Sequence, residues 1–127
     1  MRIIIETIPH STQKYETVGN YWTDEDGTQH IVVSELGNDD YSFLIAIHEL
    51  VEAKLCQKRG ISNEAIDKFD MEFEANRKGA DVAEPGDEPT APYVREHCFA
   101  TGIERLMCAE LGVNWQDYET SINGLGA

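Results

Sequence analysis

The sequence predicts an α+β fold, in which a small N-terminal antiparallel β meander is followed by three main helices packed together. Two β-branched runs occur in the first third of the chain, and from Tyr41 onward the apolar residues follow a helical period instead. The chain has 127 residues, which is the size of one domain. We expect residues 1–120 to form this single domain and residues 121–127 to be a flexible C-terminal tail.

The expected β meander contains three short strands. Residues 2–8 and 29–34 each concentrate β-branched side chains. Between them, the acidic segment 24–27 ends in glycine and is typical of a turn. This turn places Tyr21 and Trp22 on a strand that is antiparallel to the strand of residues 29–34.

The first expected helix runs from about Tyr41 to Lys58, with Asp39 or Asp40 as its N-cap. Side chains at helical spacing define one stripe along it, which we expect to face the core. This stripe consists of Leu44, Ile45, His48, Val51, Glu52 and Leu55.

Two further helices are expected. The second covers about residues 63–78, is capped by Ser62 and ends before Gly79. Its inward stripe consists of Ile66, Phe69, Asp70 and Phe73. The third covers about residues 92–111, and the segment 114–119 is expected to make one short turn. The apolar face of the third helix consists of Phe99, Ala100, Ile103, Leu106 and Met107.

The charge of the chain excludes two classes of partner. The sequence has 10 Lys and Arg residues and 24 Asp and Glu residues, so its formal net charge is −14. This charge repels nucleic acid and an anionic membrane surface. A protein or a peptide is the class of partner that remains, and the sequence leaves the oligomeric state open.

The cysteines indicate a reducing compartment. Cys56, Cys98 and Cys108 are odd in number and form no C-x-x-C pair, so neither a disulfide framework nor a cysteine-rich zinc site is expected. The first residues reach Glu6 after only three consecutive isoleucines, which is too short for the apolar core of a secretory signal. We therefore expect a cytoplasmic protein.

An imidazole and a carboxylate lie on the expected core stripe of the first helix. His48 and Glu52 are one turn apart, so their side chains project about 6 Å from each other on one face. A buried carboxylate without a partner costs several kcal/mol, and it is therefore paired, protonated or bound to a metal. The spacing suits two ligands of one tetrahedral ion.

The surrounding segment has the pattern H-E-x-x-E, which differs from the metalloprotease pattern H-E-x-x-H only in its last ligand. In this interpretation His48 and Glu52 hold one divalent transition metal ion, with Zn²⁺ as the expected metal, and Glu49 is the general base. His97 is the expected third ligand, which requires that the first and third helices are antiparallel neighbours. The alternative for His97 is a partly exposed side chain bonded to a backbone carbonyl.

Other interpretations of the same region stay open. His48 and Glu52 could simply pair with each other, or with Lys or Arg, at the margin of the core. Asp70 and Glu104 could each be a fourth ligand or could orient a ligating histidine, and a salt bridge to Arg105 is the alternative for Asp70. The acidic loop before the His97 helix is most simply a solvated connection, although its position suits a flap over a site.

Several segments of the chain together resemble a known family. They are residues 47–53, Phe69-Asp70, Phe73-Glu74, Gly86-Asp87-Glu88-Pro89, Ala91-Pro92-Tyr93, Glu96-His97, Ala100-Thr101 and Ile103-Glu104-Arg105. This combination resembles a family of short phage and prophage proteins of uncharacterised function, and the resemblance covers nearly the whole chain. It implies a protein of the cytoplasm of a bacterial host cell.

A second resemblance covers only the expected β meander and the first helix. A small antiparallel sheet followed by a helix with an H-E-x-x motif is similar to minimal zincin-type metallopeptidases. This similarity implies that His48 is a metal ligand and that Glu49 is the catalytic base. Glu52 departs from the family pattern, which has a second histidine there.

Three classes of function follow from these observations. The first is a zincin-like, metal-dependent hydrolase that cleaves a peptide or amide bond. The second is a non-catalytic phage accessory protein with a structural metal site or a buried polar network. The third is an acidic interaction module that engages a basic protein. The number of protein ligands around a metal separates the first two, because a catalytic site keeps one position open.

Overall fold

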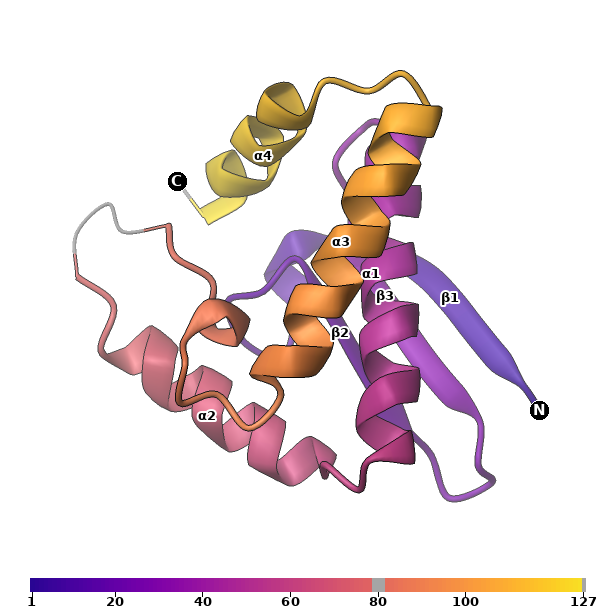
Figure 1. The fold of residues 1–127 in the computed structure, drawn as a ribbon, viewed down its shortest axis with the longest axis vertical. Coiled ribbons are helices and arrows are strands. Elements are labelled where there is room, and N and C mark those ends of the chain that lie inside the picture. Colours follow the sequence, from indigo (N-terminus) through magenta and orange to yellow (C-terminus); the bar gives the residue numbers. More distant parts are fainter. Residues whose placement is uncertain (79–81, 127) are drawn as a thin grey trace.

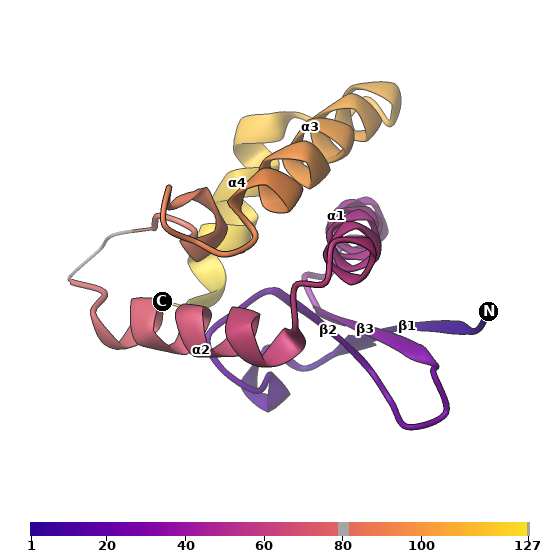
Figure 2. The same ribbon diagram turned by 60° about the horizontal axis from the view of Figure 1, so that its bottom comes forward.

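The chain forms a small sheet covered on one face by helices (Figure 1). The computed structural model describes residues 1–78 and 82–126. Figure 2 shows helix α1 directly above the sheet and helix α3 above α1, whereas α2 lies beside the sheet. The α+β class is therefore confirmed.

The sheet is mixed, and the prediction of an antiparallel meander is wrong. Its strands are β1 (Ile3–Ile8), β2 (Gly19–Thr23) and β3 (Gln29–Ser34), in the order β1-β3-β2. The β2–β3 hairpin is antiparallel as expected, but β1 runs parallel to β3. Strand β3 occupies the central position, and its Ile31 and Val33 side chains are fully buried there.

Helix α1 (Asp39–Lys58) crosses this sheet and carries the H-E-x-x-E pattern. Its N-cap is Asn38 and neither of the two expected aspartates, because the Asn38 side chain accepts hydrogen bonds from the backbone N–H groups of Asp40 and Tyr41. The buried side chains of the helix include Leu44, Ile45, His48 and Glu52, as expected, whereas Val51 and Leu55 are only half-buried.

Helix α2 (Asn63–Ala75) begins as predicted and ends earlier. The Ser62 hydroxyl accepts a hydrogen bond from the backbone N–H of Ala65, which is the expected cap. The helix stops three residues before its predicted end at Lys78, and Gly79 lies outside the described residues. On the expected stripe, Ile66 and Asp70 are buried and the two phenylalanines are half-buried.

Helix α3 (Val94–Glu110) runs antiparallel to α1 and buries part of the face that its apolar residues predict: Ala100 is buried, whereas Ile103 and Met107 are half-buried. Phe99 and Leu106 are 56% and 67% exposed. The buried side instead combines small residues with polar ones: Glu96, His97, Ala100, Glu104 and Cys108. The contacts of these polar side chains with α1 therefore decide how the helix is rotated, against its local apolar pattern.

Helix α4 (Trp115–Asn123) is longer than the single turn expected at residues 114–119, and the 3-10 turn Gly124–Gly126 follows it. Tyr118 anchors the helix, because its side chain is fully buried and its ring lies 5.3 Å from that of Tyr41. Two other 3-10 turns, His10–Thr12 and Pro85–Asp87, lie in the long connections. Among the described helices, none has the length and apolar character that a bilayer span needs.

Candidate metal centre

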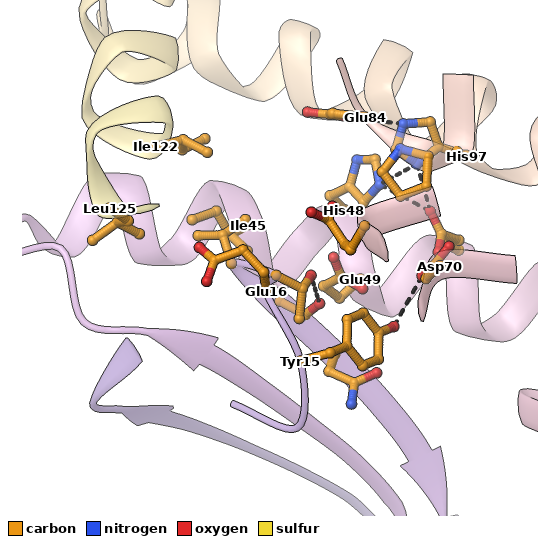
Figure 3. A pocket seen from close by; sticks show the side chains of 18 of the residues that line it. Tyr15, Glu16, Ile45, His48, Glu49, Asp70, Glu84, His97, Ile122 and Leu125 are labelled. Atoms are coloured by element: carbon orange, nitrogen blue, oxygen red, sulfur yellow. Dashed lines mark hydrogen bonds and ion pairs between the residues drawn. The ribbon is translucent and has the colours of Figure 1, made fainter. Parts of the chain in front are cut away.

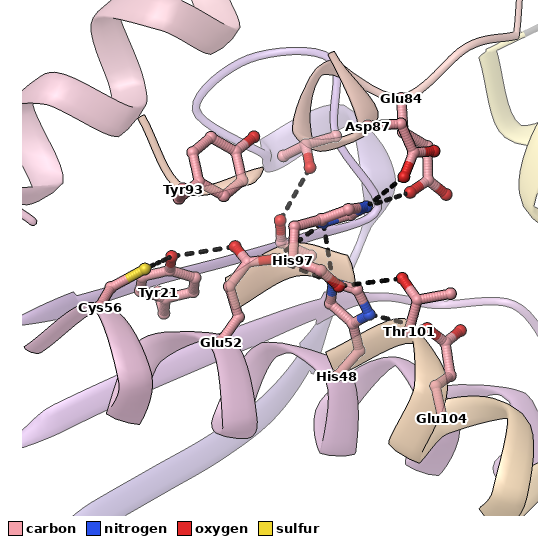
Figure 4. A network of polar contacts seen from close by, with 12 residues as sticks. Tyr21, His48, Glu52, Cys56, Glu84, Asp87, Tyr93, His97, Thr101 and Glu104 are labelled. Atoms are coloured by element: carbon pink, nitrogen blue, oxygen red, sulfur yellow. Dashed lines mark hydrogen bonds and ion pairs between the residues drawn. The ribbon is translucent and has the colours of Figure 1, made fainter. Parts of the chain in front are cut away.

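Three side chains on α1 and α3 bring potential ligand atoms together in the interior (Figure 4). The distances are 3.0 Å from His48 Nε2 to Glu52 Oε2, 2.9 Å from His97 Nδ1 to the same oxygen, and 3.2 Å between the two ring nitrogens. All three residues are buried. The antiparallel packing of α1 and α3 thus places His97 against His48.

Each histidine ring also faces a carboxylate with its other nitrogen. Nδ1 of His48 lies 2.7 Å from Oε1 of Glu104, and Nε2 of His97 lies 2.8 Å from Oε2 of Glu84. The second contact is an ion pair whose angles fall outside those of a hydrogen bond. Carboxylates at these positions favour protons on the outer nitrogens, so that the inner nitrogens of the neutral rings present lone pairs to each other.

Two tyrosine hydroxyls fix the carboxylates of this network. Tyr21 on β2 donates a hydrogen bond of 2.9 Å to Oε1 of Glu52, and Tyr118 on α4 donates one to Oε2 of Glu104. Because Tyr21 occupies Oε1, the second oxygen of Glu52 is left to face the histidines. The network is therefore held from the sheet and from α4 as well as from the two central helices.

The ionisation of these groups in the metal-free protein follows from their contacts. Burial lowers the pKa of both imidazoles, but their carboxylate partners outweigh it. The pKa of His48 lies well above its usual value because of Glu104 and Glu52, and Glu52 and Glu84 raise the pKa of His97 to about 10. Burial raises the pKa of Glu52, and its hydrogen bonds with the two histidines more than reverse this shift.

Glu49 is positioned differently from Glu52. It accepts no hydrogen bond from any residue in the described part of the chain, and it lines the cleft beside His48 (Figure 3). Burial and the negative charge of Glu52 raise its pKa to about 8. Its side chain fits there because Gly19 on β2 has no side chain: a Cβ atom at this position would lie 2.7 Å from Cγ and Oε1 of Glu49.

The acidic loop before α3 covers His97. The loop contains the 3-10 turn Pro85–Asp87, and a Cβ atom at Gly86 would lie 2.4 Å from Cγ of the His97 ring. Glu84 and Asp87 are exposed, yet both carboxylates point at Nε2 of His97, at 2.8 and 3.4 Å. The loop is therefore more than the solvated connection that its composition favours.

Asp70 belongs to a neighbouring network. Its carboxylate accepts hydrogen bonds from the hydroxyls of Tyr15 and Tyr93, and it has no contact with Arg105, which lies over the ring of Trp115 at 4.5 Å. Burial raises the pKa of Asp70 to about 6 despite these two donors. The structure thus brings Glu104, but not Asp70, into contact with a histidine of the candidate centre.

The candidate centre opens onto a cleft of about 510 Å³. The α1 side is lined by Ile45, His48 and Glu49, and the far end by Ile122 and Leu125 (Figure 3). Residues 121–125, expected to belong to a tail, therefore include part of this wall. A small molecule or a chain segment fits a cleft of this volume.

Five residues that the sequence predicts at the site all line this cleft: His48, Glu49, Glu52, His97 and Glu104. Their roles as ligands, base and orienting group stay predictions. The two orienting tyrosines, Tyr21 and Tyr118, were not predicted, because a single tyrosine in a strand or helix carries no local signal of its partner.

Comparisons with protein-family models, with curated proteins and with solved structures give no significant match to the chain. The resemblances to phage proteins and to zincin-type metallopeptidases therefore stay predictions that rest on the residues alone.

Proposed function

We propose that this protein binds one divalent transition metal ion, zinc, through Nε2 of His48, Oε2 of Glu52 and Nδ1 of His97, and that it hydrolyses a peptide or amide bond with Glu49 as general base. Two imidazoles and one carboxylate form a ligand set that is common in catalytic zinc sites. In this proposal the metal is held by these three ligands, and the substrate binds in the cleft beside them.

The observation that supports the metal most directly is the convergence of three potential ligand atoms within 2.9–3.2 Å of one another. In a tetrahedral site with metal–ligand bonds of about 2.0–2.2 Å, ligand atoms lie about 3.3–3.6 Å apart. The three side chains therefore need to separate by only a few tenths of an ångström. Carboxylates behind both ligating histidines are the usual outer partners in such sites.

The proposed catalytic role of Glu49 depends on its position in the cleft and on the availability of its carboxylate for hydrogen bonding. It lines the cleft next to the ligands and has no hydrogen-bond partner among residues 1–78 and 82–126, so its carboxylate is available to a water molecule. A cation at the three ligands would polarise a substrate carbonyl and favour the charged form of Glu49. Glu49 would then take a proton from the water molecule that attacks the carbonyl carbon.

The charges around the cleft favour a substrate with basic groups. The exposed carboxylates of Glu16 and Glu84 lie on its rim, and Glu74 and Asp70 lie on its α2 side. Arg77 also lines the cleft and forms an ion pair with Glu74, but carboxylates outnumber basic side chains there, and an excess of one sign of charge attracts ligands of the opposite sign. We infer that a peptide with Lys or Arg side chains fits this cleft better than an acidic one.

A second candidate function needs no metal. The carboxylates beside His48 and His97 raise the pKa of both imidazoles and so favour their protonated forms. Two imidazolium groups would then be neutralised by the carboxylates of Glu52, Glu104 and Glu84, as a buried polar network. In that case the protein is a non-catalytic accessory or interaction protein.

Metal analysis separates these two candidates. Protein purified without chelators and dialysed against zinc should retain about one ion per chain, and His48→Ala should lose it, because one of three ligands is removed. Lys54→Ala is a matched control, since Lys54 lies on the same helix and is exposed. A wild-type protein without bound zinc would refute the metal site.

The Glu49→Gln variant tests the catalytic part of the proposal. It should bind zinc as the wild type does, because Glu49 is not a ligand, and it should lose at least about 100-fold in the hydrolysis of a basic peptide library, since a general base contributes this much. If the wild type binds zinc but hydrolyses no peptide, the zinc site is structural and the proposed hydrolase activity is refuted. Loss of zinc in Glu49→Gln would contradict the assignment of ligand and base.

A further inference from the structure

Strand β1 is an edge of the sheet that helix α1 leaves uncovered. The order β1-β3-β2 gives β1 one strand neighbour, and α1 packs over the other two strands (Figure 2). The pairing of Ile5 with Ile31 shows that Ile3 and Ile5 are on the same face as the buried core, yet they are 37% and 48% exposed. A β-branched edge strand of this kind is a ready template for another strand.

The free hydrogen-bonding groups of β1 belong to its odd-numbered residues. The carbonyl groups of Arg2 and Ile8 accept hydrogen bonds from the residues around β3, so the even-numbered residues face β3. Backbone groups alternate in direction along a strand. The N–H and C=O groups of Ile3, Ile5 and Thr7 therefore point away from the sheet.

The sequence of this edge is complementary to itself. In an antiparallel pair of two β1 strands centred on Ile4, Ile3 of one copy lies opposite Ile5 of the other. The free N–H and C=O groups of both residues then face the partner strand and can form hydrogen bonds with it. Arg2 of each copy then lies opposite Glu6 of the other. These are non-hydrogen-bonded positions, where side chains approach most closely and opposite charges attract.

We propose that two copies of this chain associate through antiparallel pairing of their β1 strands around Ile4. The pairing joins two three-stranded sheets into one continuous sheet with a twofold axis, which is the commonest symmetry of soluble oligomers. It covers the exposed Ile3 and Ile5 of both copies and forms two Arg2–Glu6 ion pairs. These pairs also provide local attraction between chains whose net charge of −14 otherwise repels them.

Charge reversal at the two positions tests both the dimer and its register. In Arg2→Glu and in Glu6→Arg, like charges face each other twice, so each variant should dimerise at least about tenfold more weakly than the wild type in sedimentation velocity. An equimolar mixture of the two variants restores both ion pairs and should form a heterodimer with close to wild-type affinity. Glu64→Arg on α2, an exposed reversal away from β1, should dimerise at least as well as the wild type.

Both reversed residues are exposed, so the variants should keep the far-UV circular dichroism of the wild type. A wild-type protein that stays monomeric at about 1 mM would overturn the proposal. This holds even if a different protein is found to bind the β1 edge. A wild-type dimer that neither reversal weakens, or a mixture that associates no better than its components, would overturn the β1 interface and its register.

Discussion

The contact between Gly86 and His97 allows the metal proposal to be tested without changing any ligand. Replacing Gly86 by alanine adds one methyl group to the 3-10 turn above the imidazole. The backbone of Gly86 is not in the left-handed region, so alanine adds no strain of its own there. The effect of Gly86→Ala therefore comes from the contact with the ring.

The size of the effect follows from the structure. The added Cβ would lie 2.4, 2.5 and 2.8 Å from three atoms of the His97 ring, whereas ordinary contacts begin near 3.4 Å. The ring or the turn must therefore move by about 1 Å. A ring displaced by this amount cannot keep Nδ1 within 2.9 Å of Glu52 and 3.2 Å of His48. We expect zinc affinity to fall at least tenfold, since even changes in the residues behind a ligand cost about 10–100-fold.

The assay is a competition for zinc between the protein and a chromogenic chelator, followed by thermal unfolding with and without zinc. Gly102→Ala is the matched control, because Gly102 is an exposed residue of helix α3 and a Cβ atom there meets nothing within 4 Å. This control should bind zinc like the wild type and should be more stable by about 1 kcal/mol, the usual gain for alanine over glycine in a helix.

Equal zinc affinity in Gly86→Ala and in the wild type would refute the expected displacement of the His97 ring, because the 3-10 turn would then have moved instead. A variant that merely unfolds is recognised by circular dichroism. In that case the smaller change His97→Gln, which removes the ring but keeps a polar side chain under the turn, should give the same loss of affinity.

Two further predictions concern residues next to the centre. Gly19→Ala should push the Glu49 side chain away from β2. We expect zinc binding to persist and hydrolysis to fall at least about tenfold, because a displaced general base transfers the proton less efficiently. Loss of zinc binding in this variant would contradict the prediction. Asp70→Asn should gain stability relative to the wild type as pH rises from 4 to 7. The folded protein raises the pKa of Asp70 from 3.8 to about 6, so ionisation costs the wild type about 2 kcal/mol between pH 4 and 6 and about 3 kcal/mol in full above pH 7, and urea unfolding at several pH values measures it. A difference in stability that does not change with pH would show that burial does not hold this proton.

Local patterns in the chain were enough to place the helix that carries the candidate centre. The helical period of α1 puts His48 and Glu52 on one face and turns Glu49 about 100° away from His48, whatever the rest of the protein does. The Ser62 cap and the β2–β3 turn are equally local, and both appear where the sequence predicts them. Such features depend on contacts between residues only a few positions apart.

Long-range packing decided what these local patterns left open. The apolar pattern that located α3 predicted its buried face only in part, because the helix buries Ala100 together with His97 and Glu104 and leaves Phe99 and Leu106 exposed. The parallel placement of β1 depends on which strand is buried at the centre of the sheet.

The sequence alone therefore indicated the two candidate ligands that share one helix turn. Only the assembled fold could show that His97 and Tyr21 reach Glu52 from another helix and from the sheet. The physical reason is that spacing along one element is fixed by backbone geometry, whereas contact between distant elements depends on the free energy of the whole packed core.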